Sequence, residues 1–350
     1  MARSALNLPT TDPTPIFEAF RGCHSTELLT AAVAEFELFS RLDRQPMNHE
    51  NLRGELRIEP RPAVVLLTAL RAMNLLATDE AGRLTLTDLA REHLLPGGEF
   101  YVGDYLSLAA QSPAVQEMIA RLRTNRPAGA DDEEHGAAFI YRDGIESAME
   151  SEASARSLTL ALAGRAKNVA PLLAERAAMD DARVLLDVGG GTGIYSIALV
   201  QKNPQLRAIV FDRPEVLKVA GELASEYGVS DRIELVEGDM FTDALPQEVD
   251  VALLSNILHD WDVPQCRDLV RRCADSVRSG GRVLVHDVFL HDDHSGPLPI
   301  ALYSASLFSL TEGRAYSAAE YRQWLVESGL QPEEIIPTLI HCGVLTGTKP

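Results

Sequence analysis

The sequence lacks the features that mark disulfide-stapled, secreted or membrane-spanning proteins. Its 350 residues include only four cysteines, which are scattered and form no CxxC pair, so it contains neither a disulfide framework nor a zinc module, and we expect reduced thiols. The first residues have no apolar stretch like that of a secretory signal. No segment approaches the roughly 18 consecutive apolar residues of a membrane span. We therefore expect a cytoplasmic protein with no membrane segment.

Positive charge is also scarce. Asp and Glu number 51 against 32 Lys and Arg, which gives a formal net charge of −19. Nucleic-acid binding draws most of its affinity from basic side chains that neutralise phosphates, and no basic run is present. The composition therefore argues against a nucleic acid as partner. The length and the 46% of apolar residues suit a globular protein of two domains.

The N-terminal part of the chain has helical patterns. Its first fifteen residues are rich in Pro and Thr and predict a loose arm. Residues 16–42 carry more apolar side chains at helical spacing than a surface helix needs, which predicts burial against a second subunit. Residues 48–95 have the pattern of a winged helix-turn-helix. Its parts are a short helix at 48–56, a longer one at 61–77, a turn at 79–83 between two extended pieces, and a closing helix at 86–95.

A winged helix-turn-helix can bind DNA, which opens a function outside enzymes, that of a cofactor-sensing regulator. Residues 41–100, however, carry eight Arg and nine acidic side chains, whereas a DNA-reading module concentrates positive charge. We therefore expect a structural and dimerising role for this module, in a homodimer that binds no nucleic acid.

Strands and helices alternate after a helical stretch at residues 146–178. Continuous apolar strands are predicted at 184–188, 207–212, 232–238, 249–255 and 281–287, with helices between them. Such strands are typical of a mostly parallel sheet with helices on both faces. The predicted fold class is therefore α/β, with a Rossmann-like domain at residues 166–350 and an all-helical winged-helix domain at residues 1–165.

The most informative motif is a glycine loop that follows the first of these strands and opens a helix. Asp187 precedes Gly189, Gly191 and Gly193 in a D-x-G-x-G-x-G arrangement. The dinucleotide fingerprint GxGxxG needs a third glycine three residues after the second, but Ile194 stands there. The pattern favours S-adenosyl-L-methionine over NAD, with Asp187, Gly189 and Gly191 as cofactor-binding candidates.

Two further acids stand at the carboxyl ends of the next strands. Asp212 ends the strand at 207–212, where a carboxylate can accept both ribose hydroxyls. Asp239 follows the strand at 232–238, where it can accept from the adenine amino group, while Met240 packs on the purine and Phe241 lies beside it. Open α/β sheets bind ligands at this edge, so all four residues are cofactor-binding candidates.

The motifs LLDVGGGTG, FDRPEV, VEGDMF, LHDWD and the terminal TKP together resemble the plant-type small-molecule O-methyltransferases. This family includes bacterial natural-product enzymes and the hydroxyindole (acetylserotonin) O-methyltransferases. The resemblance spans most of the chain. It implies an N-terminal dimerisation domain, S-adenosyl-L-methionine as cofactor, and methyl transfer to a hydroxyl or carboxyl group of an aromatic or natural-product small molecule.

The resemblance also assigns catalytic residues. The family's general base is the histidine of the HDW motif, which falls on His259, and its first orienting carboxylate falls on Asp287. A phenol with a pKa near 10 needs such a base to become a nucleophile at neutral pH. The family's second carboxylate falls on Ala315, so it is missing here. Asp260 is expected to face the backbone or the cofactor.

Other positions are assigned by the same resemblance. Ser255 falls at a cofactor-lining position. The substrate-facing candidates, which could equally be plain core, are Leu158, Leu162, Tyr303, Ser306 and Leu307. Because a carboxylate is missing at Ala315, an enzyme that uses the cofactor for hydroxylation, decarboxylation or pericyclic chemistry remains an alternative. The segment from His286 to His294 contains three histidines and three aspartates, but a solvated loop explains it better than a metal site, and we expect no metal.

Overall fold

The structure is a computed structural model that describes residues 2–126, 152–179 and 181–350. The chain forms two compact units, which we call the sheet unit and the helical unit. The sheet unit comprises Met1–Phe17, Glu146–Phe289 and Ala318–Pro350, and the helical unit comprises Glu18–Ile145 and Leu290–Ser317. The chain therefore passes between the units several times. The expected division into domains at residue 165 stays a prediction.

The sheet unit is built on eight strands in the order β5-β4-β3-β6-β7-β10-β8, with β9 paired to β10. Their bounds are β3 Val184–Val188, β4 Arg207–Asp212, β5 Ile233–Glu237, β6 Val249–Ser255, β7 Val277–Val288, β8 Gln331–Pro332, β9 Ile336–Pro337 and β10 Cys342–Thr348. The first five are parallel, and β10 runs antiparallel to β7. The predicted mostly parallel sheet is confirmed.

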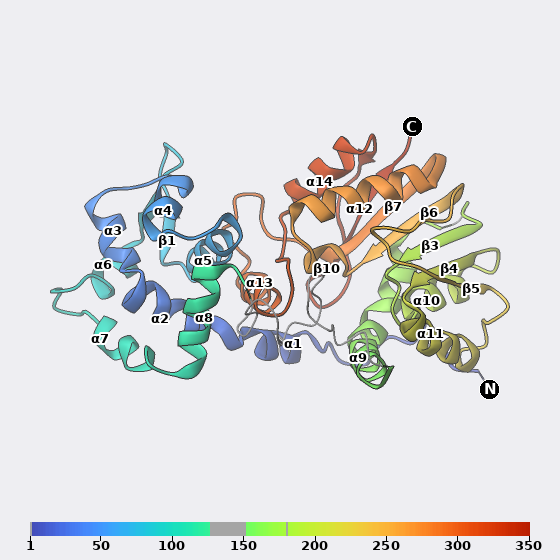
Figure 1. Cartoon of the computed structure of the whole chain (residues 1–350), viewed down its shortest axis with the longest axis horizontal. Helices are drawn as coiled ribbons and strands as arrows, with labels where there is room; N and C mark the ends of the chain where they lie inside the picture. The colour runs from blue at the N-terminus through green and yellow to red at the C-terminus, as the bar shows by residue number, and fades with distance from the viewer. Residues whose placement is uncertain (1, 127–151, 180) are drawn as a thin grey trace. The chain divides into compact units, whose positions relative to one another are not determined.

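Helices cover both faces of this sheet. Figure 1 shows α12 Val263–Ser276 and α14 Ala318–Glu327 on one face, and α9 Glu152–Arg176, α10 Ile194–Lys202 and α11 Pro214–Glu226 on the other. The central strands β3 and β6 are therefore buried almost throughout. This burial explains why they read as continuous rather than alternating apolar runs.

The strand order places a crevice at a defined point. From β3 the chain moves outward through β4 and β5, and then returns to the other side of β3 with β6 and β7. At such a reversal the loops that follow neighbouring strands leave in opposite directions, which opens a ligand site at the carboxyl ends of the strands. The loops after β3 and β6 border this point.

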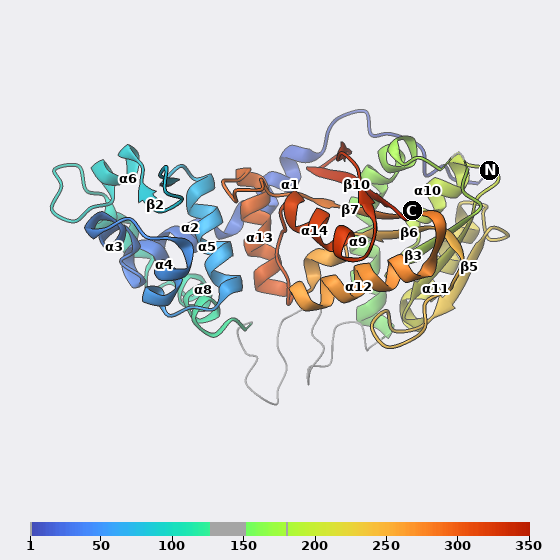
Figure 2. The same cartoon turned by 90° about the horizontal axis from the view of Figure 1, so that it is seen from above.

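The helical unit contains the predicted winged helix-turn-helix. It comprises α4 His49–Leu56, α5 Pro60–Ala72, the hairpin of β1 Leu76–Thr78 and β2 Leu84–Leu86, and α6 Asp88–His93. Helix α1 Thr14–Arg21 begins in the sheet unit and ends in the helical unit. The remaining elements of the helical unit include α2 Ser25–Thr30, α3 Leu38–Arg44, α7 Gly103–Leu106, α8 Pro113–Thr124 and α13 Leu298–Leu310. Figure 2 shows α13 alongside α5. Helix α5 ends earlier than predicted, because Asn74 takes a positive φ of 58°, which turns the chain out of the helix.

Residues 16–42 contribute to the core of their own unit, and their expected burial against a second subunit stays a prediction. Glu37 has a φ of 45°, which breaks the segment, so that α2 and α3 fold around a core of their own unit. Leu28, Phe36 and Leu38 are almost fully buried in that core. Ile16 and Phe20 on α1 are instead exposed to 72% and 79%.

The N-terminal arm is more ordered than its composition predicts. The backbone N–H of Ala5 donates to Oε1 of Gln201 on α10 over 2.8 Å, and the N–H of Arg3 donates to the carbonyl of Glu226 on α11 over 3.3 Å. Ala5 itself is buried. The arm is therefore attached to the sheet unit by long-range contacts that a local composition cannot reveal. Among the described residues, no helix is both long and apolar enough to cross a bilayer.

Candidate active site

The glycine loop joins β3 to α10 at the predicted crevice. Gly189 and Gly191 have positive φ angles of 66° and 58°, which L-residues with side chains rarely adopt. A Cβ built on Gly189 would lie 2.7 Å from Cδ1 of Ile257, whereas one on Gly191 would meet nothing within 4 Å. The backbone at Gly191 therefore faces open space, where a ligand can approach it closely.

Asp212 at the end of β4 holds this loop. Its Oδ2 accepts from the N–H of Gly191 over 2.8 Å, and its Oδ1 accepts from the N–H of Arg213 over 2.7 Å. Burial raises the pKa of the Asp212 carboxyl, and these two hydrogen bonds oppose the rise. A carboxylate has about four acceptor positions, so Asp212 retains capacity for the two hydroxyls of a ribose.

Asp187 lies beneath the loop. It is 1% exposed, and its Oδ2 accepts from Oγ of Ser196 on α10 over 2.7 Å. A Cβ built on Gly190 would lie 2.8 Å from Asp187 Cγ, so the chain passes directly over the carboxyl. Burial raises the pKa of Asp187 to about 7. These contacts make Asp187 a support for the loop, and its expected contact with the cofactor stays a prediction.

The residues after β5 reach the same loop. Sδ of Met240 lies 3.7 Å from the Cβ position of Gly189. Asp239 Oδ1 accepts from the N–H of Phe241 over 2.7 Å, which fixes the turn, and the Phe241 ring meets the edge of Trp261 at 4.7 Å between centroids. A thioether and an aromatic ring beside an open glycine loop and a strand-end carboxylate fit the adenosine part of S-adenosyl-L-methionine.

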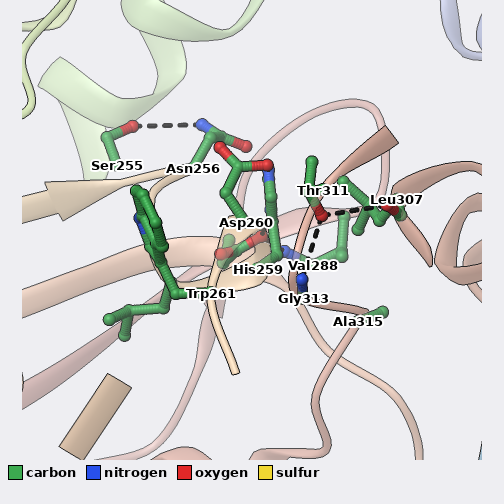
Figure 3. Close-up of polar contacts among 12 residues, drawn as sticks. Ser255, Asn256, His259, Asp260, Trp261, Val288, Leu307, Thr311, Gly313 and Ala315 are labelled. Carbon is green, nitrogen blue, oxygen red and sulfur yellow. Dashed lines mark hydrogen bonds and ion pairs between the residues drawn. The ribbon is translucent and has the colours of Figure 1, made fainter. Parts of the chain in front are cut away.

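Ser255, at the end of β6, belongs to a polar network (Figure 3). Its Oγ accepts from Asn256 Nδ2 over 3.1 Å and lies 2.8 Å from Nδ1 of His286. Burial lowers the pKa of His286 to about 3, so this histidine is neutral. Ser255 thus has partners within the protein, and a cofactor-lining role for it stays a prediction.

Arg165 on α9 was not singled out by any sequence motif. One of its Nη atoms donates to Oδ1 of Asn256 over 2.6 Å and the other to Sγ of Cys342 over 2.8 Å. Its positive charge slightly opposes the rise in the pKa of His259 and adds slightly to the fall in the pKa of Asp287, shifts whose larger causes are described below. No sequence signal pointed to Arg165, because its neighbours on α9 are ordinary helical residues.

His259 stands on a short 3-10 turn, Leu258–Asp260, that follows β6. Cys266 on α12 anchors this turn, since its Sγ donates to the carbonyl of Leu258 over 3.0 Å and to that of Trp261 over 3.2 Å. The imidazole is 4% exposed. Both ends of the turn are therefore fixed to the following helix, which restricts the position of the ring.

The expected pairing of His259 with Asp287 is present in the structure. Nδ1 of His259 lies 2.6 Å from Oδ1 of Asp287, and the same oxygen accepts from the N–H of Val288 over 2.8 Å. Burial alone would lower the pKa of His259, but the charges of Asp287 and Asp260 and the hydrogen bond that His259 makes to Asp287 raise it above its usual value. Burial acts to raise the pKa of Asp287, and the His259 charge and hydrogen bonds bring it below its usual value.

Asp260, expected to face the backbone or the cofactor, lies beside the imidazole instead (Figure 3). Its Oδ1 is 3.7 Å from Nε2 of His259. Burial raises the pKa of Asp260 to about 6, despite the opposing effect of His259. Two carboxyl groups therefore stand near the two ring nitrogens, one at hydrogen-bonding distance and one farther away.

The substrate-facing candidates lie on both units, and their role stays a prediction. In the sheet unit Leu162 is 58% exposed on α9, and the side chain of Leu158 lies outside the described residues. In the helical unit the ring of Tyr303 lies 3.6 Å from the guanidinium carbon of Arg21. Ser306 Oγ donates to the Arg21 carbonyl over 3.4 Å, and Leu307 is buried.

Ala315 stands in the segment after α13. It is fully buried, and its N–H donates to Oγ of Ser304 over 3.1 Å. Nearby, Thr311 Oγ1 donates to the Leu307 carbonyl over 2.9 Å and accepts from the N–H of Gly313 over 3.1 Å (Figure 3). Hydrogen bonds within the helical unit thus fix this segment, although it carries no carboxylate at residue 315.

The segment rich in histidine and aspartate does not gather into one cluster. His286 faces the polar network, with Nε2 3.1 Å from Oγ1 of Thr338, whereas Nδ1 of His291 lies 3.1 Å from Oγ of Ser295. Across residues 2–126, 152–179 and 181–350, no three His, Cys, Asp or Glu side chains are arranged to hold a metal ion. The four cysteines, all of them in the described ranges, form no disulfide.

Comparison with known proteins identifies the family. A family model described as an O-methyltransferase domain matches residues 132–331. The chain is 35% identical to a 3-hydroxy-5-methyl-1-naphthoate 3-O-methyltransferase from Streptomyces sahachiroi over 91% of this chain and 89% of that one. It is 42% identical to the acetylserotonin O-methyltransferase of Bos taurus over 42% of each chain.

Solved structures agree with this assignment. An O-methyltransferase family 2 protein from Planctomyces limnophilus, crystallised in complex with apigenin, matches with a TM-score of 0.89 and 46% identity over the whole of both chains. A human N-acetylserotonin methyltransferase shares the fold, with a TM-score of 0.59 and 22% identity over 96% of each chain. The resemblance inferred from the motifs is thus confirmed. The chain belongs to the O-methyltransferase family and is an enzyme that uses S-adenosyl-L-methionine as its cofactor.

Proposed function

We propose that the enzyme methylates a hydroxyl group on an aromatic small molecule and that His259 is the general base. The observation that carries this proposal is the 2.6 Å contact between His259 Nδ1 and Asp287 Oδ1. A carboxylate in this position holds the proton on Nδ1, so that the lone pair of the neutral imidazole is on Nε2. Nε2 is then the atom that takes the proton of the acceptor.

The relatives support an aromatic acceptor. The Planctomyces limnophilus protein was crystallised with apigenin, which carries phenolic hydroxyls. The Streptomyces sahachiroi relative is named for a hydroxynaphthoate, and another relative, from Lysobacter antibioticus, is a phenazine O-methyltransferase. Their shared chemistry is a hydroxyl on a flat ring system. A phenol of this kind with a pKa near 10 is mostly protonated at neutral pH, so a positioned base increases its nucleophilicity.

The proposed step moves one proton and one methyl group. When bound, the cofactor supplies a methyl group on a positively charged sulfonium. The acceptor hydroxyl would give its proton to Nε2 of His259 as its oxygen takes the methyl group, and the cofactor would be left as a neutral thioether. The imidazolium that results is stabilised by Asp287 and by Asp260, whose negative charges raise the pKa of His259.

The residues that would hold the cofactor are those at the carboxyl ends of β3, β4 and β5. Asp212 would accept from the ribose hydroxyls, and the open backbone at Gly191 would approach the ligand. Met240 and Phe241 would line the adenine, with Asp239 as the acceptor for its amino group. Asp187 would keep the loop in place through Ser196.

A methyl-labelled cofactor assay tests the acceptor class. We expect transfer of label to apigenin and to a hydroxynaphthoate, with loss of transfer when the same compounds have their hydroxyls already methylated. Mass spectrometry of the product locates the label. Label on a carbon or nitrogen atom, or on carboxyl groups alone, would contradict the proposal.

We also propose that the enzyme is a cytoplasmic homodimer. Three large apolar side chains of the helical unit support a subunit contact, because Phe20, Tyr105 and Leu108 are exposed to 79%, 75% and 79%. A second subunit would bury these side chains, and removing apolar surface from water favours association. The absence of disulfides among the four cysteines is consistent with a reducing compartment.

A further inference from the structure

The Asp287 carboxylate has a third contact that the motifs did not indicate. Oδ1 contacts Nδ1 of His259 and accepts a hydrogen bond from the N–H of Val288. Oδ2 accepts from the hydroxyl of Tyr321 over 3.1 Å. The two oxygens therefore have different partners, and the rotation of the carboxylate about its Cβ–Cγ bond is fixed from both sides.

Tyr321 itself is rigidly packed. It stands on α14, Ala318–Glu327, and is fully buried. Its ring meets Phe289 at 5.3 Å between centroids with an interplanar angle of 71°, and Trp324 at 5.3 Å with an angle of 83°. Such edge-to-face contacts on two sides hold an aromatic ring in one orientation. The packed ring therefore holds the Tyr321 hydroxyl at a fixed position beside Asp287.

We propose that Tyr321 is a positioning residue, which holds the Asp287 carboxylate in the orientation that fixes the Nδ1–H tautomer of His259. This inference rests on the proposed role of His259 and extends it to a residue outside the motifs. Asp287 is held by a phenol and a backbone N–H in the sheet unit.

The charged and titratable groups around His259 come from four elements. Asp260 is on its own turn, Asp287 on β7, Arg165 on α9 and Tyr321 on α14. Asp287 and Asp260 raise the pKa of His259, whereas Arg165 and burial lower it. Removing the Tyr321 hydroxyl leaves Oδ2 of Asp287 buried without this donor, and an unpaired buried acceptor favours rotation of the carboxylate. The favourable charge–charge contact with His259 then weakens.

Nuclear magnetic resonance of the enzyme with 15N-labelled histidine tests this directly and needs no methyl acceptor. The two ring nitrogens have different shifts in each tautomer, so a pH titration gives both the pKa of His259 and its tautomer. In Tyr321→Phe we expect the pKa of His259 to fall and the Nδ1–H tautomer to lose population. The matched control is Tyr227→Phe, in a buried tyrosine of the sheet-unit core, which should change neither quantity.

Two results would overturn the proposal. An unchanged pKa and tautomer of His259 would show that Tyr321 does not position Asp287. A raised pKa with an intact tautomer would show that the hydroxyl only withdraws charge from a carboxylate that is held by other groups.

The variant Asp287→Asn gives a second, independent test. The effect of Tyr321→Phe on His259 should disappear in that background, because the proposed route through Asp287 is already broken. An equal effect in both backgrounds would contradict the route. If instead His259→Ala kept full methyl transfer, the proposed base would be wrong while the result on Tyr321 would stand, so the two failures are distinguishable.

Discussion

The carboxylate of Asp212 accepts a hydrogen bond from the backbone N–H of Gly191 over 2.8 Å. The residue that ends β4 thus fixes the conformation of the loop that follows β3. The same carboxylate is the candidate acceptor for the ribose hydroxyls, so binding and loop geometry depend on one side chain. A substitution at Asp212 is therefore expected to remove the acceptor for the ribose and also to loosen the glycine loop.

Asp212→Ala should weaken binding of S-adenosylhomocysteine by about tenfold to a hundredfold. The loss combines unpaired ligand hydroxyls with an N–H of Gly191 that loses its acceptor, and leaving such groups unpaired costs about 1–3 kcal/mol. Isothermal titration calorimetry measures the change. Glu234→Ala, at an exposed carboxylate on β5, is the matched control and should leave the affinity as it is. Equal affinities for the wild type and Asp212→Ala would remove Asp212 from the cofactor site.

Asp187→Asn should change how stability depends on pH. Burial raises the pKa of Asp187 to about 7 in the folded enzyme, above the usual value near 4. Between these two values the folded state binds more protons than the unfolded state, so this group makes stability fall as pH rises from 4 to 7. The uncharged Asn variant lacks this contribution.

Denaturant unfolding of the enzyme without cofactor at pH 5 and pH 8 measures the effect. The loss of unfolding free energy between the two values should be greater in the wild type, by an amount on the order of 1 kcal/mol or more. Parallel pH dependences in the two proteins would mean that Asp187 is ionised in the folded state as it is in the unfolded one.

The rate of methyl transfer to a phenol should rise with pH and then level off. His259 must be neutral to take a proton, and its pKa lies above the usual 6.5 because of Asp287 and Asp260. The midpoint should therefore lie on the alkaline side of 6.5. Two phenols with different pKa values serve as the control, since the midpoint belongs to the enzyme and should be the same with both. A midpoint that follows the pKa of the phenol would point to the acceptor instead of His259.

Light scattering at micromolar concentration should give about twice the chain mass of 38.2 kDa. Leu108→Asp places a charge in the exposed apolar set of Phe20, Tyr105 and Leu108 and should shift the protein toward the monomer. Leu235→Asp, at a 38% exposed side chain of β5 in the sheet unit, is the control. A wild type with the mass of one chain would contradict the homodimer.

The sheet unit was predictable because its signals are local. Val184–Val188 and Arg207–Asp212 form the strands expected from their apolar runs, and the loop between them has the glycines that its positive φ angles require. The antiparallel strand Cys342–Thr348 was not predicted. It pairs with β7, whose last residue lies more than fifty residues earlier in the chain. No local sequence pattern indicates a pairing over that separation.

The candidate site was predictable only where a residue is part of a motif. His259 and Asp287 were found through the resemblance, and their contact is present. Arg165 and Tyr321 were missed because each is an ordinary helical residue in sequence, and only the packing of α9 and α14 brings them to the polar groups of β6 and β7. Asp260 was expected to face the backbone or the cofactor. The short turn after β6 instead places its Oδ1 3.7 Å from Nε2 of His259.

The rate of methyl transfer by His259→Ala is the most direct test of the central claim. With a phenol as acceptor, single-turnover rates should fall by about 10²–10⁴-fold, the usual contribution of a positioned base, while the affinity for S-adenosylhomocysteine remains within about twofold of the wild type. His341→Ala, at an exposed histidine of the same unit, should leave both quantities unchanged. A His259→Ala enzyme that methylates the phenol at the wild-type rate would show that His259 is not the base.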